Sequence, residues 1–283
     1  MTPVVAAAVL LAAITHATWN ALAHHIKDQL VAFTLIGTAA GVCGLAVAVF
    51  VPLPQAAAWP WLAASVVLHV AYQALLMRSF SLGDFGQMYP IARGTAPLVV
   101  TVLAAAFIDE VPDGWASAGV AVASAGLVGV ALWGIRGRGT RPQWPALTAA
   151  LATGLAIASY TVVDGIGVRS SGTALGYTAW LVALQGLVIP AYALATRGAQ
   201  LLAQLRPVAA HGLLGGVLSL VAYSLVLWAQ TRAALAPIAA LRESSIIVGA
   251  AIGAIFFKER FGGPRIAAAG LMVLGIGLML HTS

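Results

Sequence analysis

Charged residues are scarce in this chain of 283 residues, because Asp, Glu, Lys and Arg make up only 8% of it while hydrophobic residues make up 61%. Soluble globular domains carry about 25% charged residues. A soluble fold of this length could bury a core, but its surface would then be nearly without charge. The composition therefore favours lipid as the solvent of the outer surface.

Cysteine and enzyme motifs are also scarce. Cys43 is the only thiol and lies within an apolar run, so neither a disulfide framework nor a metal cluster can form. The sequence has no glycine-rich phosphate loop followed by lysine, no His-Glu-x-x-His and no aspartate-rich metal cluster. These absences predict a protein that is not an enzyme, that uses no cofactor or metal, and that has no ATP-driven motor of its own.

The net charge of +6 does not indicate nucleic-acid binding, because the basic residues lie singly or in small groups between apolar runs. Such placement is typical of the loops of membrane proteins, where basic residues favour the cytoplasmic side. Most of them lie in the odd-numbered connections between runs, which predicts that these connections are cytoplasmic and that both termini are outside.

Long apolar runs fill nearly the whole sequence, and a membrane-spanning helix needs about 20 mostly apolar residues. Ten runs meet this requirement, at 3–23, 30–52, 60–80, 86–108, 114–134, 144–166, 174–195, 207–228, 234–257 and 263–281. The period-2 alternation of barrel strands is absent. The first run is longer than the apolar part of a signal peptide and has no basic start, so we expect it to be retained. The sequence predicts an all-α, multi-pass protein of the cytoplasmic (inner) membrane.

The two halves of the chain share short matches in the same order. The matches are Val70-Ala71-Tyr72 with Val221-Ala222-Tyr223, Pro90-Ile91-Ala92 with Pro237-Ile238-Ala239, and Phe107-x-x-Glu110 with Phe256-x-x-Glu259. They predict a first repeat over 1–135, a connecting loop over 136–143 and a second repeat over 144–283. Five spans per repeat is an odd number, so the second repeat would be inverted in the membrane. Inverted repeats are common in secondary transporters, whose substrate site lies near the midplane between them.

These matches resemble the EamA-type permeases of the drug/metabolite transporter superfamily. The resemblance covers nearly the whole chain and is best from Pro237 to Leu280, with Phe257-Lys258-Glu259-Arg260-Phe261 at the turn. It implies a basket of ten helices around a central cavity, and export or uptake of amino acids, metabolites or drugs. It also implies cytoplasmic termini for many relatives, against the distribution of basic residues, so the orientation stays open.

Three ionisable residues lie well inside apolar runs, where charges are costly and usually face a cavity or a partner: Arg93, Arg242 and Glu243. One interpretation is that the arginines bind the carboxylate or phosphonate of a substrate by paired hydrogen bonds. The alternative is a structural ion pair between Arg93 and Glu243. Glu243 is also the first candidate for carrying a coupling proton, since it is the only carboxylate that the sequence places clearly inside a span.

Polar residues recur at helical spacing on three of the runs, which indicates hydrated helix faces. They are His16, Asn20 and His24 in the first run, His69 and Gln73 beside Tyr72 in the third, and Tyr160 and Asp164 in the sixth. We expect the residues inside the runs to contact the substrate or a proton. Asp164 and His24 lie near the ends of their runs, where solvation at the membrane interface explains them.

Aromatic residues fall into two groups. Those inside the runs are candidates for lining a cavity and stacking on a substrate: Trp19, Tyr72, Tyr89, Trp180, Tyr223 and Trp228. Those at the ends of the runs fit the aromatic belt at the membrane surface: Trp59, Trp61, Trp115, Trp133 and Trp144.

Two glycine pairs and two carboxylates are explained by structure rather than by chemistry. Gly37-x-x-x-Gly41 and Gly249-x-x-x-Gly253 allow helices to approach closely. Glu110 and Glu259 come just before a turn, where helix capping explains them.

Together these observations predict a secondary transporter that moves a small polar metabolite, such as an amino acid or an organic anion, across the membrane by alternating access. The alternatives are a flippase for a lipid-linked substrate and a non-transporting membrane component. A membrane enzyme would need clustered acids or a nucleophile with its base at one membrane face, and the sequence shows neither. The expected partners are the substrate and the bilayer, with a proton as a candidate coupling ion.

Overall fold

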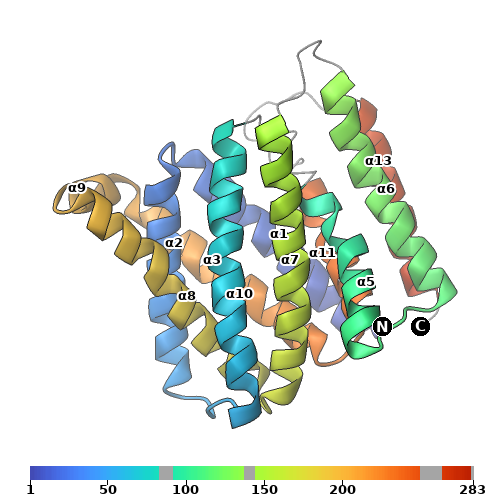
Figure 1. Ribbon diagram of the computed structural model, residues 1–283, viewed down its shortest axis with the longest axis horizontal. Helices are drawn as coiled ribbons and strands as arrows, with labels where there is room; N and C mark the ends of the chain where they lie inside the picture. Colours follow the sequence, from blue (N-terminus) through green and yellow to red (C-terminus); the bar gives the residue numbers. More distant parts are fainter. Residues whose placement is uncertain (83–91, 137–143, 249–262, 282–283) are drawn as a thin grey trace. The chain divides into compact units, whose positions relative to one another are not determined.

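The computed structural model describes residues 1–82, 92–136, 144–248 and 263–281 (Figure 1). The first half contains α1 (Pro3–His25), α2 (Gln29–Ala48), the 3-10 turn η1 (Ala56–Ala58), α3 (Trp59–Leu82), α5 (Ala96–Ile108) and α6 (Gly114–Arg136). The second half contains α7 (Trp144–Ser170), α8 (Ala174–Arg197), α9 (Gln200–Leu205), η2 (Arg206–Val208), α10 (Ala209–Gln230), α11 (Leu235–Arg242) and α13 (Gly263–Leu280). No strand occurs in these ranges, so the all-α prediction is confirmed for them.

Among the residues that the structure describes, six helical stretches have the length and apolar composition needed to cross a bilayer. They are Pro3–Ala23, Gln29–Ala48, Ala56–Ser79, Trp144–Ser170, Ala174–Arg197 and Gln200–Gln230. Ala92–Ile108, Gly114–Gly129 and Ile266–Met279 are apolar helices of shorter described length. The chain is therefore a multi-pass membrane protein, while the count of ten spans and their inverted repeat stay predictions.

Two of the apolar runs are not continuous helices where the structure describes them. The run at 234–257 contains α11, which ends at Arg242 and is followed by a turn at Glu243 and Ser244. In the run at 86–108, a turn at Thr95 separates a short helical segment from α5. Pro97 explains this second interruption, because proline has no N–H to donate to the carbonyl of Arg93 four residues earlier.

The chain forms two compact units, each assembled from distant segments. Unit 1 comprises Met1–Leu10, Ala71–Val162 and Arg232–Ser283, and unit 2 comprises Leu11–Val70 and Val163–Thr231. The repeat boundaries predicted from the sequence follow chain order instead, and they stay a prediction about internal symmetry.

Glycines bring the helices of unit 2 into close contact. A Cβ atom on Gly186 of α8 would lie 2.5 Å from the carbonyl oxygen of Gly37 and 2.9 Å from the Cα of Gly41, both on α2. On α10, a Cβ on Gly216 would lie 2.7 Å from the carbonyl oxygen of Ile36. The packing role predicted for Gly37 and Gly41 is confirmed, whereas Gly249 and Gly253 lie outside the described residues.

Glycines also allow α6 and α13 of unit 1 to pack closely, because a Cβ on Gly119 would lie 2.5 Å from the carbonyl oxygen of Gly275. A buried cluster of Val120, Ala236, Ala240 and Met279 then joins α11 to these two helices. Glu110 caps a helix that is distant in the sequence, because its Oε2 accepts a hydrogen bond of 2.8 Å from the backbone N–H of Leu235 at the start of α11.

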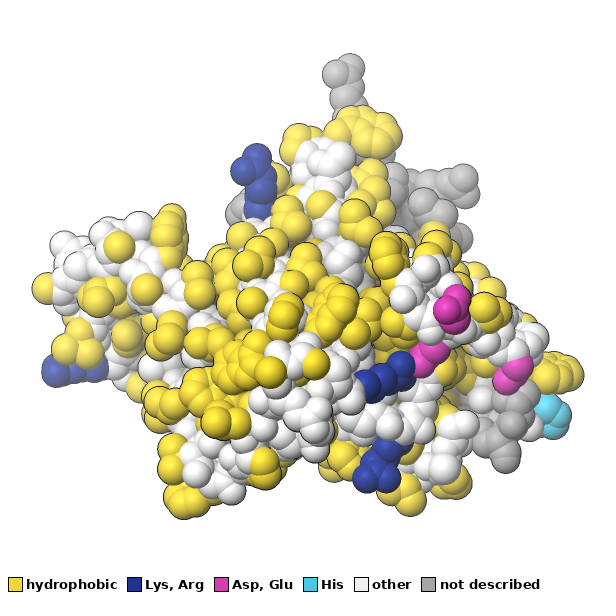
Figure 2. Space-filling model, turned by 60° about the horizontal axis from the view of Figure 1, so that its bottom comes forward, with side chains coloured by type: hydrophobic (Ala, Val, Ile, Leu, Met, Phe, Trp, Pro, Cys, Tyr) yellow, Lys and Arg dark blue, Asp and Glu magenta, His cyan; other side chains and the backbone are white. Residues whose placement is uncertain are grey.

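Large apolar side chains are exposed on the outer helix faces, as lipid contact requires. Val67 on α3 and Val102 and Phe107 on α5 are between 66% and 72% exposed. Figure 2 shows one face of the molecule, on which hydrophobic side chains are widespread and charged ones are few. Trp61, Trp115 and Trp144 are also exposed, in agreement with the aromatic belt, whereas the side chain of Trp133 is outside the described set.

Asp28 ties the start of α2 to the end of α8 in unit 2. Its Oδ1 accepts hydrogen bonds from the N–H groups of Leu30 and Val31, and its carboxylate lies 2.5 Å and 3.0 Å from the two terminal nitrogens of Arg197. The Arg197 hydrogen bond is the main cause that holds the pKa of Asp28 below its ordinary value of 3.8, against a smaller opposing effect of burial. A carboxyl group with a lowered pKa in the folded state adds stability above its unfolded pKa, which is lost as the pH falls through the folded value.

We therefore expect Asp28→Asn to lower stability at pH 7 by less than about 1 kcal/mol, because the pair is partly exposed and asparagine also caps helices well. The difference in melting temperature between the variant and the wild type should narrow below about pH 4 and also with added salt. Thermal unfolding of the detergent-solubilised protein over this pH range measures both effects. A difference that is the same at pH 3 and pH 7 would show that the charge of Asp28 contributes nothing.

Candidate functional site

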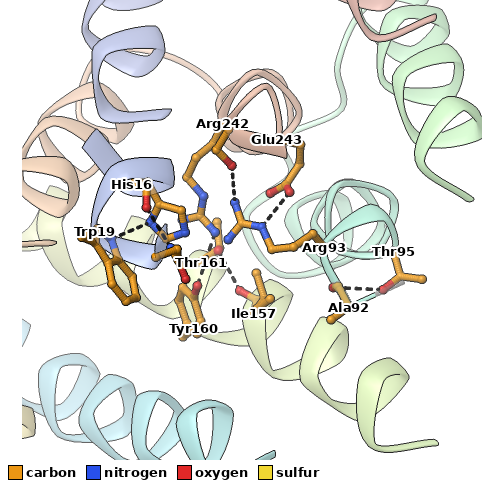
Figure 3. Close-up of polar contacts among 12 residues, drawn as sticks. His16, Trp19, Ala92, Arg93, Thr95, Ile157, Tyr160, Thr161, Arg242 and Glu243 are labelled. Atoms are coloured by element: carbon orange, nitrogen blue, oxygen red, sulfur yellow. Dashed lines mark hydrogen bonds and ion pairs between the residues drawn. The ribbon is translucent and has the colours of Figure 1, made fainter. Parts of the chain in front are cut away.

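Four polar side chains of unit 1 form a buried charged cluster, named here the arginine cluster (Figure 3). Arg93 lies just before α5, Tyr160 lies on α7, Arg242 is the last residue of α11, and Glu243 follows it. Arg93 and Glu243 are each 1% exposed, and Tyr160 and Arg242 are also buried. The ionisable residues that the sequence places inside apolar runs are thus brought together.

The hydrogen bonds of the arginine cluster link both halves of the sequence. Arg93 Nε donates to Glu243 Oε2 over 2.8 Å, and Arg93 Nη2 donates to Ser245 Oγ over 3.4 Å. Arg242 Nη2 donates to the hydroxyl of Tyr160 over 3.3 Å. The ion pair between Arg93 and Glu243, which the sequence offered as the alternative to substrate binding, is present. Substrate contact by these residues stays a prediction.

An aromatic side completes the arginine cluster. The guanidinium carbon of Arg242 lies 6.0 Å from the ring centroid of Tyr160, within the range of a cation–π contact. The ring of Tyr72 on α3 packs edge-on against Tyr160, with centroids 5.5 Å apart. Tyr72 and Tyr160 therefore join the predicted arginines and glutamate in one place.

Both charged segments of the arginine cluster lie where a helix is interrupted. Arg93 precedes the turn at Thr95, and Arg242 and Glu243 occupy the end of α11. The N–H groups of Glu243 and Ser244 bond three residues back, to Ala240 and Leu241, so the helix tightens before it ends. Discontinuous helices at membrane depth are typical of ion and substrate sites in transporters, because they expose backbone groups inside the protein.

A second buried cluster, in unit 2, surrounds Asp164 on α7 and is named here the aspartate cluster. Asp164 is 0% exposed, so the prediction that it is solvated at the membrane interface is wrong. The reason is that α7 continues to Ser170, which places Asp164 more than one turn inside the helix. The prediction that Glu243 is the only carboxylate clearly inside a span is wrong for the same reason, because Asp164 is a second one.

Two tyrosines and a histidine surround this carboxylate. Tyr177 on α8 donates to Asp164 Oδ1 over 3.0 Å, and Tyr223 on α10 donates to Oδ2. The ring of His69 on α3 packs edge-on against Tyr223, with centroids 5.3 Å apart. The sequence proposed His69 and Tyr223 as site residues, but it did not identify Tyr177, whose role depends on the helix opposite Asp164.

The polar stripe on α1 forms its own local contacts in unit 2. Trp19 Nε1 donates to His16 Nδ1 over 3.2 Å, a bond drawn in Figure 3, and the two rings lie edge-on with centroids 5.1 Å apart. Asn20 Nδ2 donates to the carbonyl oxygen of His16 over 2.8 Å. Side chains that bond along one helix can form these contacts without a substrate, so the stripe adds less to a site than the two clusters do.

The remaining predicted site residues are placed individually. Gln73 on α3 and Trp228 on α10 are half-buried. Trp180 on α8 is half-buried and packs edge-on against Trp59 with centroids 5.6 Å apart, as part of an apolar cluster of unit 2. Tyr89 lies outside the described residues, and so does the side chain of His24. Within the described ranges, no group of three His, Cys, Asp or Glu residues is placed to hold a metal ion.

Comparison with known proteins establishes the fold. No family model matches the chain, and no curated protein matches it. Chains of known structure do match, 29 in number. One of them, described only as a crystal structure of a protein, has a TM-score of 0.75 and 18% sequence identity over 98% of this chain and 99% of that chain. A likeness at this identity, over nearly the full length of both chains, shows that the two proteins share a fold.

Proposed function

We propose that the protein is a secondary transporter that moves a small polar metabolite with an anionic group across the cytoplasmic membrane. The observation that carries the proposal is the arginine cluster, in which two guanidinium groups and one carboxylate are buried in a membrane protein. Ionisable residues within membrane spans are rare, and they usually mark the pathway of a substrate or an ion.

The chemistry of the arginine cluster favours an anionic group on the substrate. Two guanidinium groups, those of Arg93 and Arg242, are buried in it. The planar donors of arginine match the oxygens of a carboxylate or phosphonate and can bind them by paired hydrogen bonds.

The architecture that we propose for this activity has ten spans in two inverted repeats, as in the EamA-type permeases that the sequence resembles. The matches at Pro90 and Pro237 each precede an arginine, and both arginines lie at a helix interruption. Such interruptions allow a helix to change its direction locally during alternating access. Substrate release on one side and binding on the other would then follow from a change in the surroundings of Arg242.

The test is transport by the purified protein in proteoliposomes, with a panel of amino acids, dicarboxylates and phosphonates. We expect uptake of an anionic or zwitterionic compound, and we expect Arg242→Gln to reduce it at least about tenfold, because a charge-assisted hydrogen bond contributes about 1.5–3 kcal/mol. Arg206→Gln, at an exposed arginine of η2, is the matched control and should transport as the wild type does.

Two results would contradict this proposal in different ways. If Arg242→Gln transports at the wild-type rate, the arginine cluster is not the substrate site. If the folded wild-type protein transports nothing in the panel but moves a fluorescent phospholipid between leaflets, the flippase alternative replaces the metabolite transporter.

A further inference from the structure

The aspartate cluster gathers polar groups from four helices of unit 2 around one carboxylate. Asp164 comes from α7, Tyr177 from α8, Tyr223 from α10, and Ser65 and His69 from α3. Asp164, Tyr177 and Ser65 are 0% exposed, and His69 is 5% exposed. Asp164 is not part of the arginine cluster, so the role of the aspartate cluster needs its own explanation.

The partners of Asp164 suit both the ionised and the neutral carboxyl group. The hydroxyls of Tyr177 and Tyr223 donate to its two oxygens, and Ser65 is a further hydrogen-bonding neighbour. A hydroxyl can donate to a carboxylate, and it can also rotate to accept a hydrogen bond from a protonated carboxyl group. The surroundings therefore satisfy Asp164 before and after it takes up a proton.

Glu243 of the arginine cluster has a different kind of partner. The guanidinium of Arg93 can only donate hydrogen bonds, and it keeps its proton at all physiological pH values. A protonated Glu243 would leave Arg93 as a buried charge facing a neutral acid, which is expensive. The geometry thus favours Asp164 over Glu243 as a carboxylate that changes its protonation state.

His69 supplies a second group that can bind the same proton. Its Nδ1 lies 3.0 Å from the backbone carbonyl oxygen of Ser65 and 3.1 Å from the Ser65 hydroxyl. The carbonyl can accept a hydrogen bond from a protonated Nδ1, and the hydroxyl can donate to an unprotonated one, so Ser65 suits either tautomer of the ring. The neutral imidazole has one basic nitrogen in each tautomer. The edge-on ring of Tyr223, which donates to Asp164, lies beside the imidazole.

We propose that Asp164 and His69 together bind one exchangeable proton, and that this proton is the one coupled to transport. Uptake forms an O–H bond on Asp164 or an N–H bond on the unprotonated ring nitrogen of His69, and release returns the proton to water without any other reactant. The titratable groups that face Asp164 are His69 of α3, Tyr177 of α8 and Tyr223 of α10. Arg169, farther along α7, donates to the backbone carbonyl of Gln230. The coupling of this proton to transport rests on the proposed transport function, whereas the existence of the proton site does not.

The proton site can be tested without knowing the substrate, by infrared difference spectroscopy of the purified protein between high and low pH. We expect a band from the C=O stretch of a protonated carboxyl group that shifts in D₂O, disappears in Asp164→Asn, and changes its pH dependence in His69→Gln. Asp113→Asn, at a helix-capping aspartate before α6, should retain the band. Tyr223→Phe keeps the carboxylate and removes one hydroxyl, so it should shift the frequency of the band without abolishing it. A band that is unchanged in Asp164→Asn would overturn the proton site.

Coupling is tested in proteoliposomes that contain a pH-sensitive dye. With a transported substrate added, we expect proton flux in the wild type and at least about a tenfold smaller flux in Asp164→Asn, whose uptake should no longer respond to a pH gradient. If wild-type transport is insensitive to a pH gradient, the proton of the aspartate cluster is not coupled to transport. If the wild type shows the infrared band but transports no substrate, the transport proposal fails and the proton site stands.

Discussion

Replacing Glu243 by alanine is expected to lower the free energy of unfolding by about 3–5 kcal/mol, the usual effect of removing one partner of a buried ion pair. Glu243 and Arg93 are both 1% exposed and lie 2.8 Å apart, so the variant would leave the guanidinium of Arg93 without this carboxylate at a site far from water. Equilibrium unfolding in mixed detergent and lipid, followed by circular dichroism, measures the change.

A double variant separates stability from function at this pair. Arg93→Met with Glu243→Met replaces the ion pair by apolar groups of similar length, and such replacements are often neutral or stabilising. We expect the double variant to recover most of the stability that Glu243→Ala loses, and yet to transport no anionic substrate. Wild-type transport by a stable double variant would show that the pair serves the fold alone.

The second large effect is expected at Gly186, where α2 and α8 meet. Gly186→Ala places a methyl group 2.5 Å from a backbone oxygen and 2.9 Å from a backbone carbon of α2, so one helix must move. Overpacking of this kind typically costs about 1–3 kcal/mol. Thermal unfolding of the solubilised protein should show a clear decrease in melting temperature.

Gly129→Ala is the matched control for this prediction, because it adds a methyl group to α6 where nothing lies within 4 Å. Replacing an open glycine in a helix by alanine typically adds about 0.5–1 kcal/mol of stability. Equal melting temperatures for the two variants would mean that close helix contact at Gly186 does not limit stability.

Much of the fold follows from the sequence because lipid imposes simple requirements on length and polarity. The apolar run at 144–166 predicts α7 to within four residues of its observed end. The buried charges can also be predicted from the sequence, since Arg93 and Glu243 are charged residues within apolar runs. The ion pair between them was one of two alternatives that the sequence allowed.

The aspartate cluster could not be recognised from the sequence, because its parts come from four helices that are distant along the chain. The four-residue extension of α7 moves Asp164 from an expected interface into the interior. Tyr177 reaches Asp164 because Gly167, on the same face of α7, leaves room for its ring, and a Cβ at that position would collide with the phenol. The sequence indicated a polar helix face from the spacing of Tyr160 and Asp164. This spacing could not reveal the aspartate cluster, because Tyr160 belongs to the arginine cluster.

The end of α11 at Arg242 could not be predicted from the sequence either. Arg242 and Glu243 lie in an apolar run long enough for one continuous helix, and no proline follows them within the next turn. Hydrophobicity alone therefore favours an unbroken span. The turn is explained by the tertiary partners, because Glu243 must face Arg93 while Arg242 reaches Tyr160.

The meeting point of α2 and α8 has a consequence for how α8 can bend. Pro190 lies inside α8 and has no N–H, so the carbonyl oxygen of Gly186 receives no hydrogen bond from the usual position one turn later. The bare α-carbon of Gly37 faces this oxygen, since a Cβ built on it would lie 3.6 Å away. A hinge at Gly186 would therefore stay shielded from acyl chains by the neighbouring helix, and α8 could flex there without solvation by water.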